Sequence, residues 1–189
     1  YIHNEPILSP GKYGMFDDCG VMPSHIIKVN DEYWMYYLGW NVRNTIAYHN
    51  SIGLAISKDQ CQTFNKFSEG PIFDRNYKEP YYSAMPFVIR EKSNWHMWYL
   101  SNTKWEFING RTEPFYHIKY AYSKNGIDWI RNAEVSIDYK NSDECGIVRA
   151  CVIPCENGYR MWYSYRGHNN YRENKDHSYR IGYAESLNG

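Results

Sequence analysis

The sequence predicts an all-β protein built from four-stranded antiparallel blades, which is the architecture of a β-propeller. Two observations support this prediction. The 189-residue chain contains 20 Tyr and 7 Trp, and such aromatic enrichment favours strands. The chain also repeats itself about every 63 residues, and self-similarity at a fixed spacing is typical of repeat architectures. Because closed rings need about 4 to 8 blades, the three repeats predict part of a longer ring, with self-association or an unusual closed form as alternatives.

Each repeat begins with two strands joined by a short polar turn. We expect these hairpins at residues 20–40, 83–105 and 146–167, with the turns "VNDE", "EKSN" and "CENG". The residue types in these turns are those that tight hairpin connections require. The second strand of each hairpin is centred on Met-Tyr-Tyr or Met-Trp-Tyr, which predicts strands packed into the interior of a blade.

A third and a fourth strand complete each predicted blade. The third strand ends in Ala-x-Ser at residues 52–57, 118–123 and 181–186. Fourth strands are expected near "GPIFDR" (70–75) and "AEVSIDY" (133–139), and "NEPILSP" resembles the first of these segments. The chain therefore reads as one incomplete propeller domain over residues 1–189. Its repeat units cover about 20–75, 83–140 and 146–189, with residues 1–10 as a closing or preceding strand.

The charge balance and the absence of other motifs exclude several classes of function. Lys plus Arg equals Asp plus Glu at 21 each, which argues against general attraction to nucleic acid or to a membrane surface. No apolar segment approaches the roughly 18 residues of a membrane span, and no signal-peptide pattern is present. The five cysteines form no Cys-x-x-Cys pair, so a disulfide framework or zinc site is not indicated, and a cytoplasmic location with reduced thiols is favoured.

No cofactor or metal site is expected. The sequence contains no Gly-rich phosphate loop or nucleotide-binding fingerprint. His49, His117 and His177 precede the third strands, but at unequal offsets, so we interpret them as polar loop residues and not as metal ligands.

Long segments on one face of the predicted blades are the expected binding region. Connections between second and third strands emerge on the same face as the segments that precede the first strands, and they span residues 39–51, 101–117 and 164–180. These segments carry Trp40, Arg43, Trp105, Tyr165 and Arg166. Aromatic rings beside guanidinium donors suit a ligand with apolar ring faces and hydroxyl edges, such as a sugar.

Carboxylates occur at matching places on the same face. Asp17, Glu79 and Glu144 lie six or seven residues before the equivalent position of each first strand, so we expect them in one pocket. Carboxylates that converge cannot all remain ionised cheaply, which would leave one as a proton donor and another as a base. Glycoside hydrolysis requires such a pair. The alternative is that these residues are turn caps.

The motifs "FDDCGVMPS", "AMPFVI", "ECGIVRACVI" and "MWYSYRG" followed by "YRIGYAES" resemble those of the five-bladed β-propeller glycosidases. That superfamily includes glycoside hydrolase families 32, 43, 62, 68, 117 and 130, and the chain looks closest to members labelled only as glycosidase-like. The resemblance implies an Asp in the first blade as base or nucleophile and a Glu in the third as general acid. Asp17 matches the first, with Asp18 as the competing choice, and Glu144 matches the third.

The second blade departs from the pattern of the family. Where the resemblance implies an Asp that orients substrate, the chain offers Glu79 or Ser83. Arg149 corresponds to a channel arginine that contacts the substrate or the acid in the family that the chain resembles.

The resemblance implies an oligosaccharide or polysaccharide partner. Two interpretations remain open. The first is a glycoside hydrolase or phosphorylase that acts through Glu144 and Asp17. The second is a non-catalytic glycan-binding or scaffold propeller, because a fold of this type does not itself imply activity.

Overall fold

The computed structural model describes residues 4–188, and this range contains twelve strands and no helix. It therefore contains no helix capable of spanning a membrane. The first blade is an antiparallel sheet with the strands in sequence order. Its strands are β1 (Gly20–Val29), β2 (Glu32–Val42), β3 (Tyr48–Ser57) and β4 (Asn65–Lys66).

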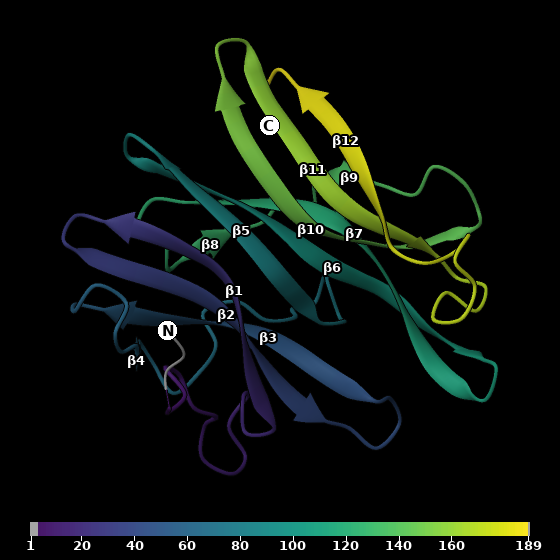
Figure 1. Ribbon diagram of the computed structural model, residues 1–189, viewed down its shortest axis with the longest axis horizontal. Coiled ribbons are helices and arrows are strands. Elements are labelled where there is room, and N and C mark those ends of the chain that lie inside the picture. Colours follow the sequence, from purple (N-terminus) through teal and green to yellow (C-terminus); the bar gives the residue numbers. More distant parts are fainter. Residues whose placement is uncertain (1–3, 189) are drawn as a thin grey trace.

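Two further blades share the second sheet. The second blade consists of β5 (Ser83–Glu91), β6 (Asn94–Ile108) and β7 (Arg111–Ser123), with short β8 (Trp129–Ile130) and β9 (Val135–Ile137) paired to β7. The third blade consists of β10 (Glu144–Cys155), β11 (Gly158–Gly167) and β12 (Arg180–Ser186). The two are joined where Gly146 of β10 pairs in parallel with Tyr116 of β7. Figure 1 shows the second blade between the first and the third.

The predicted fold class and hairpins are confirmed, with changes at the outer strands. The fourth strand of the first blade is β4 and not residues 70–75, where Phe73 forms only an isolated bridge with Ile52. In the second blade β9 lies within the expected segment 133–139. Of the N-terminal ten residues, 1–3 lie outside the described range and 4–10 form no strand, although the Phe64 N–H donates to the Ile7 carbonyl at 3.3 Å.

Aromatic side chains from the strand centres fill the spaces between blades. Trp34 of the first blade stacks on Trp95 of the second, with ring centroids 5.4 Å apart. Tyr36 and Trp98 are fully buried in the two inter-blade clusters. Burial of each such side chain contributes about 1.5–3 kcal/mol. The Met-aromatic-aromatic triplets are thus core elements that hold the blades together.

The expected loop over residues 101–117 is a long hairpin instead. Strands β6 and β7 continue to a turn at Asn109 and Gly110, visible as the extended arm of the second blade in Figure 1. Both turn residues have positive φ, at 51° and 83°, as a type I′ turn requires. The expectation of a loop here was wrong, because the Asn-Gly pair forms a tight turn that lets the two flanking segments pair as strands.

Replacement of Gly110 by Val will destabilise this hairpin. A β-branched residue in the left-handed region costs about 1–2 kcal/mol, because its Cβ contacts the following carbonyl. Urea denaturation should show this loss, whereas Gly70→Val, at a glycine with open space around it and no positive φ, should have a smaller effect. Equal losses in the two variants would contradict the turn assignment.

Candidate functional site

The inner strands of the three blades surround a pocket of about 350 Å³, here called the axial pocket. Its walls come from β2 and β3, from β5 to β7, from β10 and β11, and from the residues just before β5 and β12. The lining residues are Leu38, Trp40, Tyr48, Asn50, Tyr82, Ala84, Met85, Leu100, Tyr116, Val148, Arg149, Ser164 and Tyr179. The pocket is therefore largely apolar and aromatic, with few polar groups, as is common for ligand sites.

A group of packed aromatic rings forms one wall. Tyr48 lies at its centre, with ring centroids 4.8 Å from Trp40, 5.3 Å from Trp105 and 5.6 Å from Tyr82. The rings come from three separate strands and one loop, so tertiary packing alone brings them together. Rings fixed in this way offer flat apolar surfaces at low entropic cost.

Bulges in the inner strands direct two side chains into the pocket. The β5–β6 register shifts between Ala84 and Phe87, and the β10–β11 register shifts between Val148 and Cys151. Within these bulges Met85 and Arg149 line the pocket with φ of 48° and 60°.

Each of these conformations costs on the order of 1–3 kcal/mol for a non-glycine residue. Bulges commonly re-aim side chains next to functional sites. Two equivalent strained positions facing one pocket therefore identify it as the candidate site.

Three polar residues line the pocket. Within residues 4–188, Arg149 is exposed and forms no ion pair or side-chain hydrogen bond. Asn50 is 3% exposed, and its Oδ1 has no hydrogen-bond partner in the described chain. Ser164 is the third group. Leaving a buried amide oxygen unpaired costs about 1–3 kcal/mol, so a ligand donor at this point would be favourable.

A buried arginine supports the pocket from behind. Arg166 is 1% exposed and donates from Nε to Tyr116 Oη at 3.0 Å, and Tyr116 in turn hydrogen-bonds Tyr179. Its Nη2 donates to the Pro114 carbonyl at 2.9 Å, and its guanidinium lies 3.9 Å from the Tyr171 ring centroid. Arg166 thus positions the pocket tyrosines and does not itself line the pocket.

Asp17 is held inside the first blade. Its side chain is buried, its Oδ2 accepts a hydrogen bond from Tyr37 Oη at 3.0 Å, and the same oxygen lies 2.5 Å from Lys66 Nζ. Burial is the main cause that raises the pKa of Tyr37, and the Asp17 charge adds to it. The hydroxyl therefore remains a donor to the carboxylate.

Glu79 has the equivalent arrangement in the second blade. It is 4% exposed and accepts hydrogen bonds from Tyr99 Oη at 3.1 Å, Lys119 Nζ at 2.8 Å and Arg131 Nη1 at 2.9 Å. Burial by itself would raise the pKa of Glu79, but Lys119 and Arg131 outweigh it, so the pKa lies below its ordinary value.

The three expected carboxylates occupy different surroundings, and none lines the axial pocket. Asp17 and Glu79 each accept a hydrogen bond from the last Tyr of the strand triplet, as equivalent positions of a repeat should, and each pairs with a Lys, Lys66 of β4 or Lys119 of β7. Glu144 is partly exposed and lines a smaller cavity of about 250 Å³ with Tyr165, Arg180 and other polar residues. Its Oε2 accepts a hydrogen bond from the Lys140 N–H at 2.8 Å.

Asp18 lies beside the enclosed Asp17 but has a more open position. It accepts hydrogen bonds from the Cys19 thiol, the Gly14 N–H and Asn41 Nδ2. The Cys19 and Gly14 donors lower the pKa of Asp18 most, so this carboxylate is ionised at neutral pH.

The remaining expected binding residues are dispersed. Trp40 and Arg149 line the axial pocket, and Trp105 supports its wall. Arg43 is exposed outside the axial-pocket lining, and Ser83 is fully buried in β5 with no hydrogen-bond partner for Oγ in the described chain.

Three aromatic or amide residues of the pocket were not predicted from the sequence. These are Tyr48, Asn50 and Tyr82, whereas Tyr116 lies in the segment 101–117 that was expected to carry the binding face. The sequence carries no signal for the Met85 bulge, because the extra residue occurs at the same place in "AMPF" and "VRAC" and leaves no gap between the two repeats.

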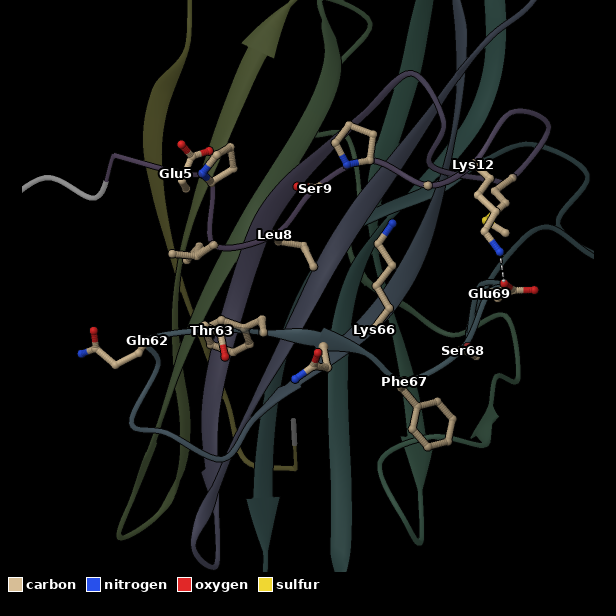
Figure 2. A pocket seen from close by; sticks show the side chains of 17 residues that line it. Glu5, Leu8, Ser9, Lys12, Gln62, Thr63, Lys66, Phe67, Ser68 and Glu69 are labelled. Carbon is tan, nitrogen blue, oxygen red and sulfur yellow. Dashed lines mark hydrogen bonds and ion pairs between the residues drawn. The ribbon is translucent and has the colours of Figure 1, made fainter.

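A larger cavity of about 720 Å³ lies on the outer face of the first blade, between residues 5–12 and 62–69. Figure 2 shows Lys66 rising from β4 toward the segment that carries Ser9 and Lys12. An exposed ion pair, Lys12 with Glu69 at 3.1 Å, lies at its edge. This cavity lacks the packed Trp and Tyr rings of the axial pocket.

The chain matches no known protein-family profile. Two proteins of Mycobacterium tuberculosis, uncharacterized protein MT1551 and uncharacterized protein Rv1502, are 39% and 38% identical to it over 163 residues. These matches cover 86% of this chain and 54% of each relative. The chain thus spans about half the length of the curated relatives it matches.

Three solved structures show the same arrangement of strands. A glycoside hydrolase has a TM-score of 0.69 at 19% identity, with 97% of this chain and 51% of that chain covered. A Bombyx mori family 32 β-fructofuranosidase in complex with sucrose has a TM-score of 0.66 at 16% identity, covering 85% and 32%. A family 117 glycoside hydrolase of Zobellia galactanivorans has a TM-score of 0.63 at 18% identity, covering 96% and 56%. The chain therefore has the fold of the β-propeller glycoside hydrolases.

Proposed function

We propose that this chain is carbohydrate-active and that the axial pocket holds a sugar. The observation that carries the proposal is that the packed wall around Tyr48 lines one cavity together with the polar residues Asn50 and Arg149. Apolar ring faces of a sugar would stack on the wall, and its hydroxyls would meet the amide and the guanidinium. The sucrose bound to the Bombyx mori structure of like fold is consistent with this class of ligand.

Replacement of Trp40 by Ala should weaken saccharide binding in the full-length protein. Loss of a stacking ring from a binding site costs about 1–3 kcal/mol, so we expect a roughly 5- to 150-fold rise in Kd by calorimetry. Trp162→Ala is the matched control, because Trp162 is 38% exposed on the third blade and outside the pocket. If Trp40→Ala and the wild type bind the saccharide with equal affinity, the axial pocket is excluded as the sugar site.

Hydrolysis of a glycosidic bond is a second candidate function, favoured by two accessible carboxylates. Glu144 is partly exposed in an open cavity and would act as general acid. Asp18 is held ionised by its donors and would serve as base or nucleophile in preference to Asp17, whose carboxylate is enclosed by Tyr37 and Lys66. Phosphorolysis through the same residues is the alternative to hydrolysis. It is distinguished from hydrolysis because product release would then depend on added phosphate.

A further inference from the structure

We propose that the axial pocket selects a saccharide that carries an anionic group, a carboxylate or a phosphate, and that Arg149 binds this group. The inference deepens the proposed function and rests on it. It follows from the charge of the pocket, from the conformation of Arg149 and from the unpaired amide oxygen of Asn50 in the same pocket.

The pocket has a positive charge and no negative one. Among the lining residues in the described chain, Arg149 is the only ionised side chain at neutral pH, and neither Asp nor Glu contributes to the wall. Arg166 adds a second positive charge behind Tyr116. Its hydrogen-bond partners are Tyr116, Cys145 and two carbonyls, and within residues 4–188 it forms no ion pair.

Glu113, which the Tyr171 hydroxyl contacts beside Arg166, is already paired with two other cations. Glu113 is 5% exposed and is held by Arg111 Nε at 2.8 Å and by Arg172 Nη1. Two cations therefore share its one negative charge. Charges in a low-dielectric interior act over longer distances than in water, so the pocket is expected to attract an anion.

The backbone conformation at Arg149 directs its side chain into the axial pocket. The residue has φ of 60° within the β10 bulge, and the equivalent bulge in β5 presents Met85 with φ of 48°. The same strained geometry thus offers an apolar side chain from one blade and a free guanidinium from the next. A guanidinium forms paired hydrogen bonds with carboxylate or phosphate oxygens, which gives it both affinity and orientation.

The saccharide part of the ligand is indicated by the rest of the pocket. The buried amide oxygen of Asn50 has no hydrogen-bond partner, and a sugar hydroxyl would donate to it. The ring wall of Trp40 and Tyr48 needs an apolar face. An acidic or phosphorylated sugar supplies the hydroxyl donor for Asn50, the apolar face for the ring wall and the anion for Arg149. A neutral sugar leaves Arg149 unpaired.

The test compares matched ligands by calorimetry in the full-length protein. The pairs are glucose with glucose 6-phosphate, galactose with galacturonate, and a galactose oligosaccharide with its uronate counterpart, and inorganic phosphate serves as the anion alone. We expect at least one anionic member to bind about ten- to a hundredfold more tightly than its neutral twin, as charge-assisted hydrogen bonds allow. Arg149→Gln should abolish this preference and leave the affinity for the neutral sugar within about twofold.

Two further variants make the result specific. Arg149→Lys keeps the charge and should retain part of the preference, which also shows that the position tolerates substitution. Arg75→Gln removes an exposed arginine outside the pocket lining and should leave the preference unchanged. The ratio of the affinities for the anionic and the neutral sugar is compared within each variant. A modest loss of folding stability in that variant therefore affects both affinities equally and leaves the ratio unchanged.

Each contrary outcome overturns a defined claim. Equal binding of anionic and neutral twins would overturn the inference and leave the sugar site intact. A preference that survives Arg149→Gln would overturn the role of Arg149. Inorganic phosphate that binds as tightly as the phosphorylated sugar would overturn the saccharide part. If no sugar of either charge binds, the proposed function fails and the inference with it.

Discussion

Replacement of Glu79 by Gln should lower the free energy of unfolding by about 3–5 kcal/mol, because it leaves two buried cations without their anion. Lys119 and Arg131 each have side chains that are 13% exposed, and both donate to this carboxylate. A Gln retains the shape and one acceptor but not the charge. Urea denaturation monitored by tryptophan fluorescence measures the difference.

The control for this variant is Glu69→Gln. Glu69 pairs with Lys12, and both side chains are largely exposed, so its loss should change stability by about 0–1 kcal/mol. A similar small effect at Glu79 would mean that the buried cluster contributes little net stability. It would also reopen a catalytic role for that carboxylate.

The Glu79 cluster should also make stability depend on pH. The folded-state pKa of Glu79 lies below its ordinary value of 4.5, so the charge contributes stability that is present above that pH. This contribution is lost as pH falls through the lowered folded pKa. The wild type should therefore lose more stability between about pH 5 and pH 3 than Glu79→Gln does. Parallel losses in both proteins would contradict the assignment.

Replacement of Glu144 by Gln should lower turnover of a cleavable oligosaccharide by about 10²- to 10⁴-fold in the full-length protein. The reason is that Gln cannot supply the proton to the leaving group. Saccharide affinity should change little, because Gln has nearly the size of Glu and the missing proton is required only in the transition state. Product release with and without phosphate, measured beside calorimetric affinity, separates the two effects.

Glu156→Gln is the matched control for Glu144, because Glu156 lies in the exposed turn between β10 and β11 at the other end of the same hairpin. It should leave turnover unchanged. Full activity of Glu144→Gln would exclude this residue as the acid. Tight saccharide binding by a wild type that turns nothing over would favour a glycan-binding propeller.

Much of the fold followed from local patterns. The polar turns and the Met-aromatic-aromatic triplets predicted the hairpins, because side-chain alternation and turn chemistry depend on neighbouring residues. The outer strands were harder to place. β4 has only two residues, and the pairing of Phe73 with Ile52 depends on what packs beside it.

The candidate site was only partly predictable. Register placed Asp17 and Glu79 at equivalent positions, and the structure gives them equivalent partners. Their burial could not be read from the sequence, because Lys66 of β4 and Lys119 of β7 lie far along the chain from the carboxylates that they bind.

The sequence by itself determined the repeat, the hairpins and which residue types are available for sugar recognition. Only the tertiary structure decided that Tyr48, Asn50 and Arg149 share a cavity, while Asp17 and Glu79 are enclosed by lysines. The physical reason is that strand periodicity and turns are local properties, whereas the direction of a side chain depends on a bulge and on the neighbouring blade. A single-residue bulge in β10 or β5 changes which side chain faces the axial pocket. Packing between the blades determines where the bulge forms.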